Sequence, residues 1–218
     1  MSNSATSIGS GLHRPIILTV SVLLHLIKWQ LRLAPGEVWT SSAERDCLAR
    51  HAAGKRLLAE IGVWHGGTSC RLRTAMASDG TLYAIDPYPP GRLGFSIPRI
   101  VGRREVNRIR NGRVVWVRMS GAAAGRTPAI QRAAPFDFIF VDDAQSYETL
   151  REEWETWAPL VRAGGIIALH DTQTQPGDGG REQSSVRYAR EVVLKDERFE
   201  VLETVDLLTV LRRRAIVE

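Results

Sequence analysis

The chain has 218 residues, a length that predicts one domain, alone or with a small appendage. Hydrophobic residues make up 44% of the sequence and charged residues 24%, which excludes disordered, collagen-like and coiled-coil proteins. The formal net charge is +5, and the two cysteines are too few for a disulfide scaffold and lie in no spacing that suggests zinc.

Residues 1–40 are predicted to form an N-terminal helical appendage, and residues 41–218 the main domain. The apolar run at residues 15–27 is shorter than the about 20 residues of a membrane-spanning helix, and no cleavage site follows it. Two interpretations stay open. The run is a helix that packs on the domain or on a partner subunit of a homo-oligomer, or residues 15–33 contact a membrane surface. The expected location is therefore cytoplasmic, with or without peripheral membrane contact.

Short apolar runs alternate with helical patterns from residue 57 onward. The predicted strands cover residues 57–62, 82–86, 114–117, 136–141 and 165–170. The predicted helices cover residues 68–77, 100–109, 147–157 and 186–195. Strands that alternate with helices at this spacing predict an α/β fold with a parallel sheet and helices on both faces.

The last two apolar runs, residues 199–204 and 207–211, break this alternation. Two residues between them can close a hairpin but cannot carry a helical crossover, so the two strands are predicted to be antiparallel. Loops at residues 87–98 and 172–180 follow the carboxyl ends of strands, which is the edge where open α/β sheets bind ligands.

A glycine-rich motif, E-x-G-x-x-x-G, runs from Glu60 to Gly66 at the first strand–helix junction. Gly62 lets the chain turn off the strand, and Gly66 lets a ligand approach the backbone at the helix start. The spacing differs from that of pyrophosphate-binding turns, and an acid at the strand end suits a cationic ligand group. The alternative is a purely structural glycine-rich turn.

Asp86 ends the next predicted strand, 24 residues beyond Gly62. A carboxylate at this place accepts two hydrogen bonds from a ribose diol in nucleotide-binding α/β folds. The alternative is an aspartate that caps the turn before Pro87. A nucleoside that also carries an ammonium group fits both signals, so S-adenosylmethionine is the expected cofactor.

Asp142 and the pair His170–Asp171 follow two strands that are predicted to be neighbours, so they should face one crevice. Two carboxylates and one further donor suit a hard divalent cation such as Mg²⁺, which would lower the pKa of a substrate hydroxyl. The predicted metal ligands are Asp142, His170 and Asp171. The alternative is a set of hydrogen-bonding loop residues without a metal.

Residues 41–212 resemble a class I S-adenosylmethionine-dependent methyltransferase, in a small bacterial subgroup related to macrolide-sugar O-methyltransferases and cephalosporin-hydroxylase-like proteins. The segments that carry the resemblance are residues 60–69, 83–87, 91–96 and 136–172. It implies a Rossmann-like fold and O-methylation of a hydroxyl on a sugar or another small-molecule or glycan acceptor. The implied cofactor-binding residues are Glu60, Gly62, Val63, His65, Gly66, Thr68, Ser69, Asp86 and Asp142.

The chain departs from the family pattern at residues 142–148, where D-D-A-Q-S-Y-E replaces D-G-D-H-S-Y-E. Gln145 thus stands in place of a histidine, a natural general base. The candidate catalytic residues are Asp142, His170 and Gln145, with Asp142, His170 or the metal alone activating the hydroxyl. The same departure keeps a catalytically weakened, cofactor-binding partner protein as an alternative.

Seven arginines fall within residues 99–118, offset only by Glu105. They form either a solvated helix face or a docking surface for a phosphorylated glycan, a lipid carrier or RNA. Trp116 is the only aromatic residue among them, and its strand position places it in the core, so base stacking is poorly supported. An RNA methyltransferase is the alternative function, and nucleic acid is not the expected partner.

Overall fold

The computed structural model describes residues 39–91, 94–174 and 183–215. The predicted N-terminal helix and its membrane or subunit contact lie outside these ranges and stay predictions, as does most of the loop at residues 172–180. Within the described ranges, every helix is too short or too polar to cross a bilayer.

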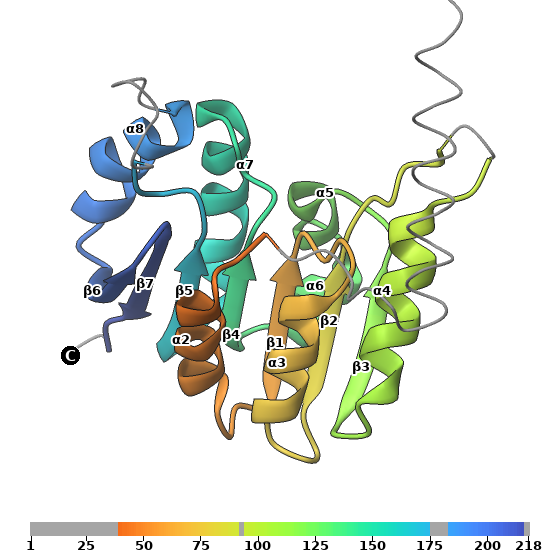
Figure 1. The fold of residues 1–218 in the computed structure, drawn as a ribbon. Helices are drawn as coiled ribbons and strands as arrows, with labels where there is room; N and C mark the ends of the chain where they lie inside the picture. The colour runs from red at the N-terminus through yellow and green to blue at the C-terminus, as the bar shows by residue number, and fades with distance from the viewer. Residues whose placement is uncertain (1–38, 92–93, 175–182, 216–218) are drawn as a thin grey trace, which may run out of the picture. The chain divides into compact units, whose positions relative to one another are not determined.

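The domain is built on one seven-stranded sheet with the strand order β3-β2-β1-β4-β5-β7-β6 (Figure 1). Strands β1 to β5 are parallel, β7 is antiparallel to β5, and β6 is antiparallel to β7. The strands are β1 Leu57–Ile61, β2 Thr81–Ile85, β3 Arg113–Val117, β4 Phe136–Val141, β5 Val161–Leu169, β6 Phe199–Val205 and β7 Leu208–Arg213. The predicted parallel sheet with a C-terminal antiparallel hairpin is confirmed.

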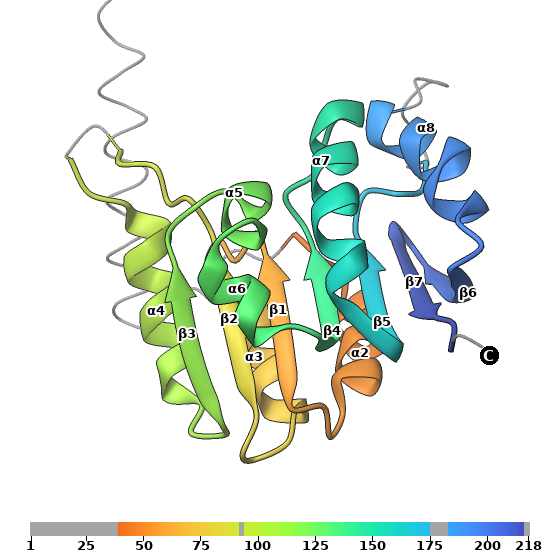
Figure 2. The ribbon, with the colours of Figure 1, turned by 180° about the vertical axis from the view of Figure 1, so that it is seen from behind.

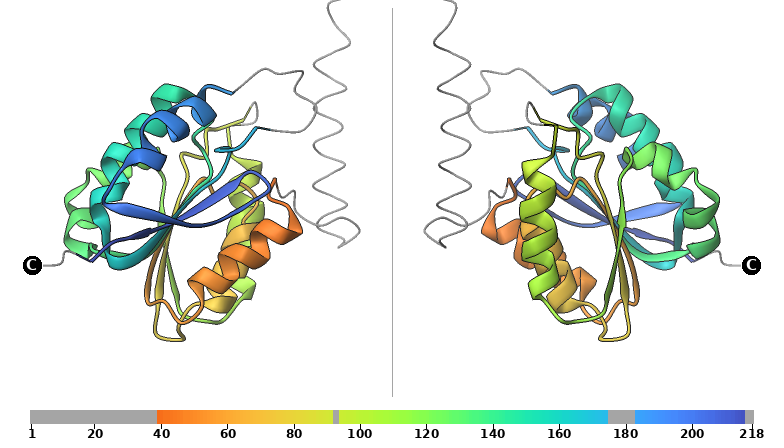
Figure 3. Two further views of the ribbon diagram at one scale, coloured as in Figure 1. Left: turned by 90° about the vertical axis from the view of Figure 1, so that its left-hand side faces the viewer. Right: turned by 90° about the vertical axis from the view of Figure 1, so that its right-hand side faces the viewer.

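Helices cover both faces of the sheet, as Figures 2 and 3 show. One face carries α2 Ser42–Ala52, α3 Gly67–Ala75 and α4 Ile97–Arg108, and the other carries α5 Gly121–Gly125, α6 Pro128–Ala133, α7 Tyr147–Trp157 and α8 Ser184–Glu191. Side chains of β4 alternate between the two cores: Phe138 and Phe140 pack toward α2 and α3, whereas Ile139 and Val141 pack toward α7. The sheet is therefore buried on both faces, as parallel sheets require.

Several element boundaries differ from the predicted ones. Strand β5 begins at Val161 rather than at residue 165. Its pairing with β4 shifts register between Phe136 and Phe138, so the strand includes the exposed residues 162–164. Helix α4 begins at Ile97 because Pro98 fits the first helical turn. The hairpin turns at Asp206, with φ at 50°, and Leu207, one residue later than predicted. The helix predicted at residues 186–195 ends at Glu191 and continues as a short 3₁₀ turn, Val193–Lys195.

Helix α2 was not predicted, although a capping box in the sequence marks its start. The Ser41 hydroxyl accepts the Glu44 N–H at 3.1 Å, and the Glu44 carboxylate accepts the Ser41 N–H at 2.6 Å. This reciprocal pair is a capping box, with a serine three residues before a glutamate. It starts the helix that brings Glu44 to the carboxyl edge of the sheet.

Glu153 on α7 is an acidic residue in the apolar layer between α7 and α5. Its side chain is buried, Oε1 accepts the Ala122 N–H at 2.8 Å, and Oε2 has no hydrogen-bond partner among the described residues. Burial, together with the negative charge of Asp143, raises the pKa of Glu153 to about 8. The folded protein therefore holds this proton at a pH where the unfolded chain has released it.

We expect this proton to make stability depend on pH. Between its ordinary pKa of 4.5 and about 8, Glu153 binds more protons in the folded than in the unfolded state, so the free energy of unfolding falls as pH rises. Glu153→Gln should remove this part of the slope, and Glu152→Gln, at an exposed position, should not. Urea unfolding at several pH values measures it, and equal slopes in the wild type and Glu153→Gln would contradict the assignment.

Candidate functional site

A cavity of about 630 Å³ opens at the carboxyl ends of the parallel strands. Its volume lies within the range of sites for small molecules and cofactors. The lining residues follow β1, β2, β4 and β5, with contributions from the chain before α2, the hairpin turn and the start of α8. They are Trp39, Gly62, Trp64, Asp86, Asp142, Asp143, Gln145, His170, Asp171, Gln183 and Leu207.

Asp86 links β2 to the glycine-rich loop after β1. Its Oδ2 accepts the backbone N–H groups of Val63 at 3.1 Å and Trp64 at 2.9 Å, and its Oδ1 accepts the Tyr88 N–H at 2.7 Å. The carboxylate therefore caps its turn, as the structural alternative predicted, and it also lines the cavity. Three fixed donors hold it in one orientation, which prepares its remaining lone pairs for a ligand.

The backbone around the cavity is strained at three residues. Trp64, Tyr88 and Asp171 have φ values of 49°, 43° and 53°, a region that residues other than glycine rarely adopt. Trp64 and Asp171 line the cavity, and Tyr88 binds Asp86. Such strain collects at functional sites, where the surrounding structure holds it in place.

The two glycines of the motif serve close packing of the backbone. Gly62 has φ at +87°, and a Cβ there would lie 2.9 Å from the carbonyl carbon of Asp142. Gly66 has φ at +76°, and a Cβ there would meet Val106 of α4 at 2.6 Å and the carbonyl of Gly102 at 3.2 Å. On the side where a Cβ would point, α4 fills the space beside Gly66, and the predicted approach of a ligand to its backbone stays a prediction.

Gly62→Ala should therefore destabilise the protein by more than its φ value alone explains. Overpacking costs about 1–3 kcal/mol in addition to the about 1–2 kcal/mol of a left-handed φ. Gly164→Ala is the matched control, because Gly164 has φ at +71° and nothing within 4 Å of a Cβ. Urea unfolding compares the two, and equal losses of stability would contradict the close approach to Asp142.

The other predicted cofactor-binding residues of the motif are buried behind the cavity. Glu60 is fully buried and accepts a hydrogen bond from the Ser69 hydroxyl, and Thr68 shares one with Thr40 at 3.2 Å. Val63 and His65 are buried as well, and none of these five lines the cavity. Burial, and then the charges of Asp142 and Asp86, raise the pKa of Glu60 well above its usual range. Glu60 thus lies behind the cavity wall, so its predicted contact with a cationic ligand group stays a prediction.

His170 lies among three carboxylates. Its Nδ1 is 2.8 Å from Oδ1 of Asp142 and 3.5 Å from Oδ1 of Asp171, and its Nε2 is 3.4 Å from Oε1 of Glu44. Burial alone would lower the pKa of His170, but these carboxylates outweigh burial and raise it to about 10. A pKa of about 10 favours the imidazolium form of His170 at neutral pH, which weighs against the predicted role as a general base.

Glu44 is the partner of His170 that the sequence analysis missed. Its buried carboxylate also accepts the Leu207 N–H at 2.9 Å, at the turn of the β6–β7 hairpin. Glu44 of α2 thus contacts both His170, at the end of β5, and the turn of the β6–β7 hairpin. The capping box at Ser41 was the only sequence signal for this residue.

The predicted metal ligands do not fit a magnesium site. Mg²⁺ takes oxygen ligands in near-ideal octahedral geometry. His170 would contribute a nitrogen rather than an oxygen, and its two ring nitrogens lie 2.8 Å from Asp142 and 3.4 Å from Glu44. Among the described residues, Asp142, His170 and Asp171 do not form a group whose ligand atoms all lie within 4.8 Å of one another. The positive charge between the two aspartates is the imidazolium itself.

Asp143, at the position of a glycine in the family pattern, is a second residue that the sequence analysis missed. It lines the cavity, and its Oδ1 is buried without a hydrogen-bond partner among the described residues. Burial, followed by the charges of Asp86 and Asp142, raises the pKa of Asp143 to about 6. Gln145 also lines the cavity, at an exposed position, and Ala144 is buried in the core.

Four of the lining side chains are acidic, namely Asp86, Asp142, Asp143 and Asp171, and His170 is the one described cation among the lining residues. The cavity therefore favours a ligand with positive charge.

Comparison with known proteins gives a family match: a family described as "Methyltransferase domain" matches residues 59–172. An O-methyltransferase from Bacillus cereus, solved with SAH, is 20% identical, with 89% of this chain and 90% of that chain covered and a TM-score of 0.61. TomG from Streptomyces achromogenes, an O-methyltransferase of tomaymycin synthesis solved with SAM, is 18% identical, with coverages of 81% and 82% and a TM-score of 0.58. An rRNA methylase from Streptococcus thermophilus is 14% identical, with coverages of 82% and 100% and a TM-score of 0.54. The TM-scores show that this chain shares its fold with these three proteins, and at such low sequence identities the likeness extends no further than the fold.

Proposed function

Because the chain belongs to the methyltransferase family, we propose that it methylates a hydroxyl of a sugar or another small-molecule acceptor, with S-adenosylmethionine as donor. The acidic cavity at the carboxyl edge of β1, β2 and β4 carries the proposal. S-Adenosylmethionine has a sulfonium and an ammonium group, and four aspartates around the cavity suit both charges. The methyltransferases of known structure with bound SAM or SAH share this fold.

Three of the predicted cofactor-binding residues line the cavity, which supports this proposal. Asp86 would accept the ribose diol, Gly62 would let the ligand lie close to the backbone, and Asp142 would face the ammonium group. The cofactor supplies a methyl group on positively charged sulfur. The protein then has to bind the acceptor hydroxyl, align its oxygen with that methyl group and take up one proton.

We assign Asp143 as the residue that takes up the proton of the acceptor hydroxyl. S-Adenosylmethionine would supply the methyl group, with its C–S electrons left on sulfur as the C–O bond forms, and the Asp143 carboxylate would take up the hydroxyl proton. The buried Oδ1 of Asp143 is unpartnered among the described residues, whereas Asp142 is held by His170. Gln145, in the same cavity, can orient the acceptor by hydrogen bonds but holds no proton. An aspartate thus takes the role of the missing histidine.

The arginine-rich segment supports a small acceptor rather than RNA. The Arg103 guanidinium lies over the half-buried Trp116 ring, 5.6 Å from its centroid, and Arg108 pairs with Glu105 at 2.6 Å. Arg118 donates to the carbonyls of Pro87 and Tyr88 at 3.3 Å and 3.0 Å. Three of the seven arginines thus contact groups of the same fold, and the two on α4, Arg103 and Arg108, favour the interpretation as a solvated helix face.

Transfer of a labelled methyl group from S-adenosylmethionine to fractionated small molecules, glycans and RNA tests the acceptor class. We expect label in small molecules or glycans, and turnover changed less than a few fold by serine at Arg103, Arg104 and Arg108. Label in RNA, with binding that weakens steeply with salt and fails in this triple variant, would establish the RNA methyltransferase instead.

The charge on His170 also predicts how chelators act. We expect methyl transfer to persist in excess chelator and to gain nothing from added Mg²⁺ or Mn²⁺, because the imidazolium already lies between Asp142 and Asp171. Loss of activity on chelation, with recovery in Mg²⁺ that Asp171→Asn abolishes, would contradict this. It would restore the predicted magnesium site.

A further inference from the structure

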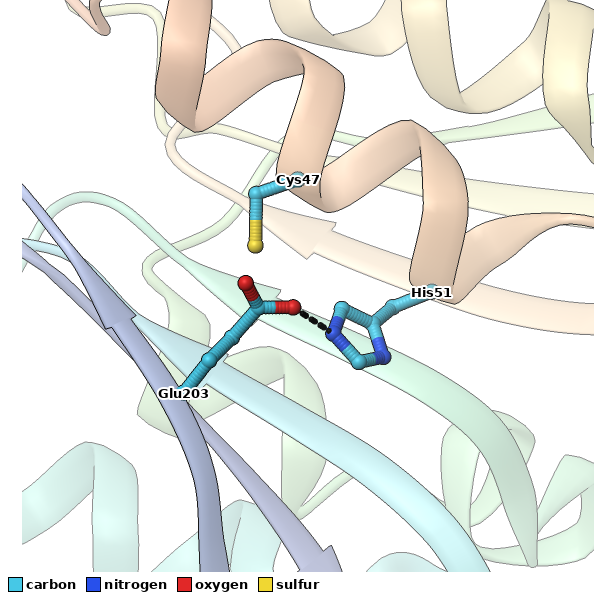
Figure 4. A group of neighbouring side chains, drawn as sticks. All are labelled: Cys47, His51 and Glu203. Atoms are coloured by element: carbon cyan, nitrogen blue, oxygen red, sulfur yellow. Dashed lines mark hydrogen bonds and ion pairs between the residues drawn. The ribbon is translucent and has the colours of Figure 1, made fainter.

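Cys47, His51 and Glu203 form a cluster away from the cavity that the methyl transfer does not use. Cys47 and His51 are four residues apart on α2, so their side chains leave the same helix face. Glu203 comes from β6, and Figure 4 shows all three side chains directed at one another. The Cys47 side chain is fully buried, whereas those of His51 and Glu203 are 19% and 33% exposed, so a small ion can reach the cluster from solvent.

We propose that these three residues bind a divalent metal ion of the zinc class between α2 and β6. One ligand atom from each of them lies within 4.8 Å of the other two, and Nε2 of His51 is 2.6 Å from Oε1 of Glu203. Tetrahedral bonds of about 2.0–2.3 Å imply ligand separations of about 3.3–3.8 Å, which small side-chain rotations here would give. Thiolate and imidazole ligands select zinc rather than magnesium.

The surroundings support a ligand set. Arg50 contacts Oε2 of Glu203 at 3.0 Å, which leaves Oε1 for the ion and fixes the carboxylate from outside. On binding, the ion would displace the Cys47 thiol proton to solvent and form a metal–sulfur bond. Three protein ligands leave a fourth position for water.

The site would join two elements that also shape the cavity. Helix α2 carries Glu44, which contacts His170 and the Leu207 N–H at the β6–β7 turn. A metal ion between Cys47 and Glu203 would fasten α2 to the same hairpin one to two turns further along the helix. No zinc-binding motif was predicted here, because Glu203 is 152 residues away from His51 in the sequence and α2 was not predicted.

Co²⁺ titration of chelator-treated, dialysed full-length protein tests the proposal. We expect one Co²⁺ per chain, with a thiolate charge-transfer band and the visible absorption of tetrahedral Co²⁺, both displaced by Zn²⁺. Cys47→Ser should abolish the charge-transfer band, and Cys70→Ser, the matched control, should keep it. His51→Gln and Glu203→Gln should each weaken Co²⁺ binding at least tenfold.

A charge-transfer band that is absent from the wild type, or that Cys47→Ser retains, would overturn the site. Should Cys47→Ser fail to fold, unchanged Co²⁺ affinity in His51→Gln and Glu203→Gln would overturn it as well. Zn²⁺ should raise the melting temperature of the wild type but not that of His51→Gln. Calorimetry with S-adenosylmethionine on the same samples keeps the two proposals apart, because loss of the metal site leaves the cofactor residues in place.

Discussion

Asp86→Ala is expected to lower the affinity for S-adenosylmethionine at least tenfold. A hydrogen bond to a charged group contributes about 1.5–3 kcal/mol, and the variant would lose two bonds to the ribose diol. It would also free the backbone N–H groups of Val63 and Trp64, which hold the glycine-rich loop. Isothermal titration calorimetry measures the affinity.

Asp79→Ala is the control for this variant. Asp79 precedes β2, at the opposite end of that strand from Asp86, and makes an exposed ion pair with Arg56 at 3.2 Å. Such pairs contribute about 0–1 kcal/mol, so affinity and stability should hardly change. Unchanged cofactor affinity in a folded Asp86→Ala variant would leave Asp86 with its turn-capping role alone.

Asp143→Asn is expected to lower kcat by about 10²-fold or more, the usual contribution of a positioned proton acceptor. In the wild type, kcat/KM should rise with pH through about 6, as the Asp143 carboxyl of the free enzyme loses its proton, and then level off. The asparagine cannot titrate, so the residual activity should lose this rise. The pH profile separates a proton acceptor from a residue that only shapes the cavity.

Gln145→Ala is the matched control, because it removes a polar side chain from the same cavity without removing a proton acceptor. We expect a change of no more than a few fold in kcat and an unchanged pH profile. If Asp143→Asn keeps both its rate and its rise near pH 6, another group takes the proton, and Asp142 is the next candidate.

The sheet could be predicted because its strands are short apolar runs that are buried on both faces. The C-terminal hairpin could be predicted because a two-residue connection is too short to link parallel strands. Asp86, Asp142 and His170 follow the carboxyl ends of predicted strands, and all three line the cavity. The helices that were not predicted are short or weakly amphipathic, namely α2, α5 and α6. The capping box is the sequence signal for α2.

The chemistry of the site depends on contacts that spacing does not show. Glu60 was predicted as a charged ligand, yet Ser69 and the core enclose it. His170 was predicted as a base or metal ligand, but Glu44, 126 positions earlier in the chain, helps to keep it protonated. Asp143 looked like a departure from a motif, and only its place in the cavity wall, with a buried Oδ1 that has no partner among the described residues, suggests a catalytic role.

A crystal structure of the wild-type protein with SAH tests the central claim most directly. The account predicts density in the cavity at the carboxyl edge of the sheet, with the ribose hydroxyls on Asp86 and the sulfur toward Asp142 and Asp143. Density at another place, or a ribose without contact to Asp86, would contradict it.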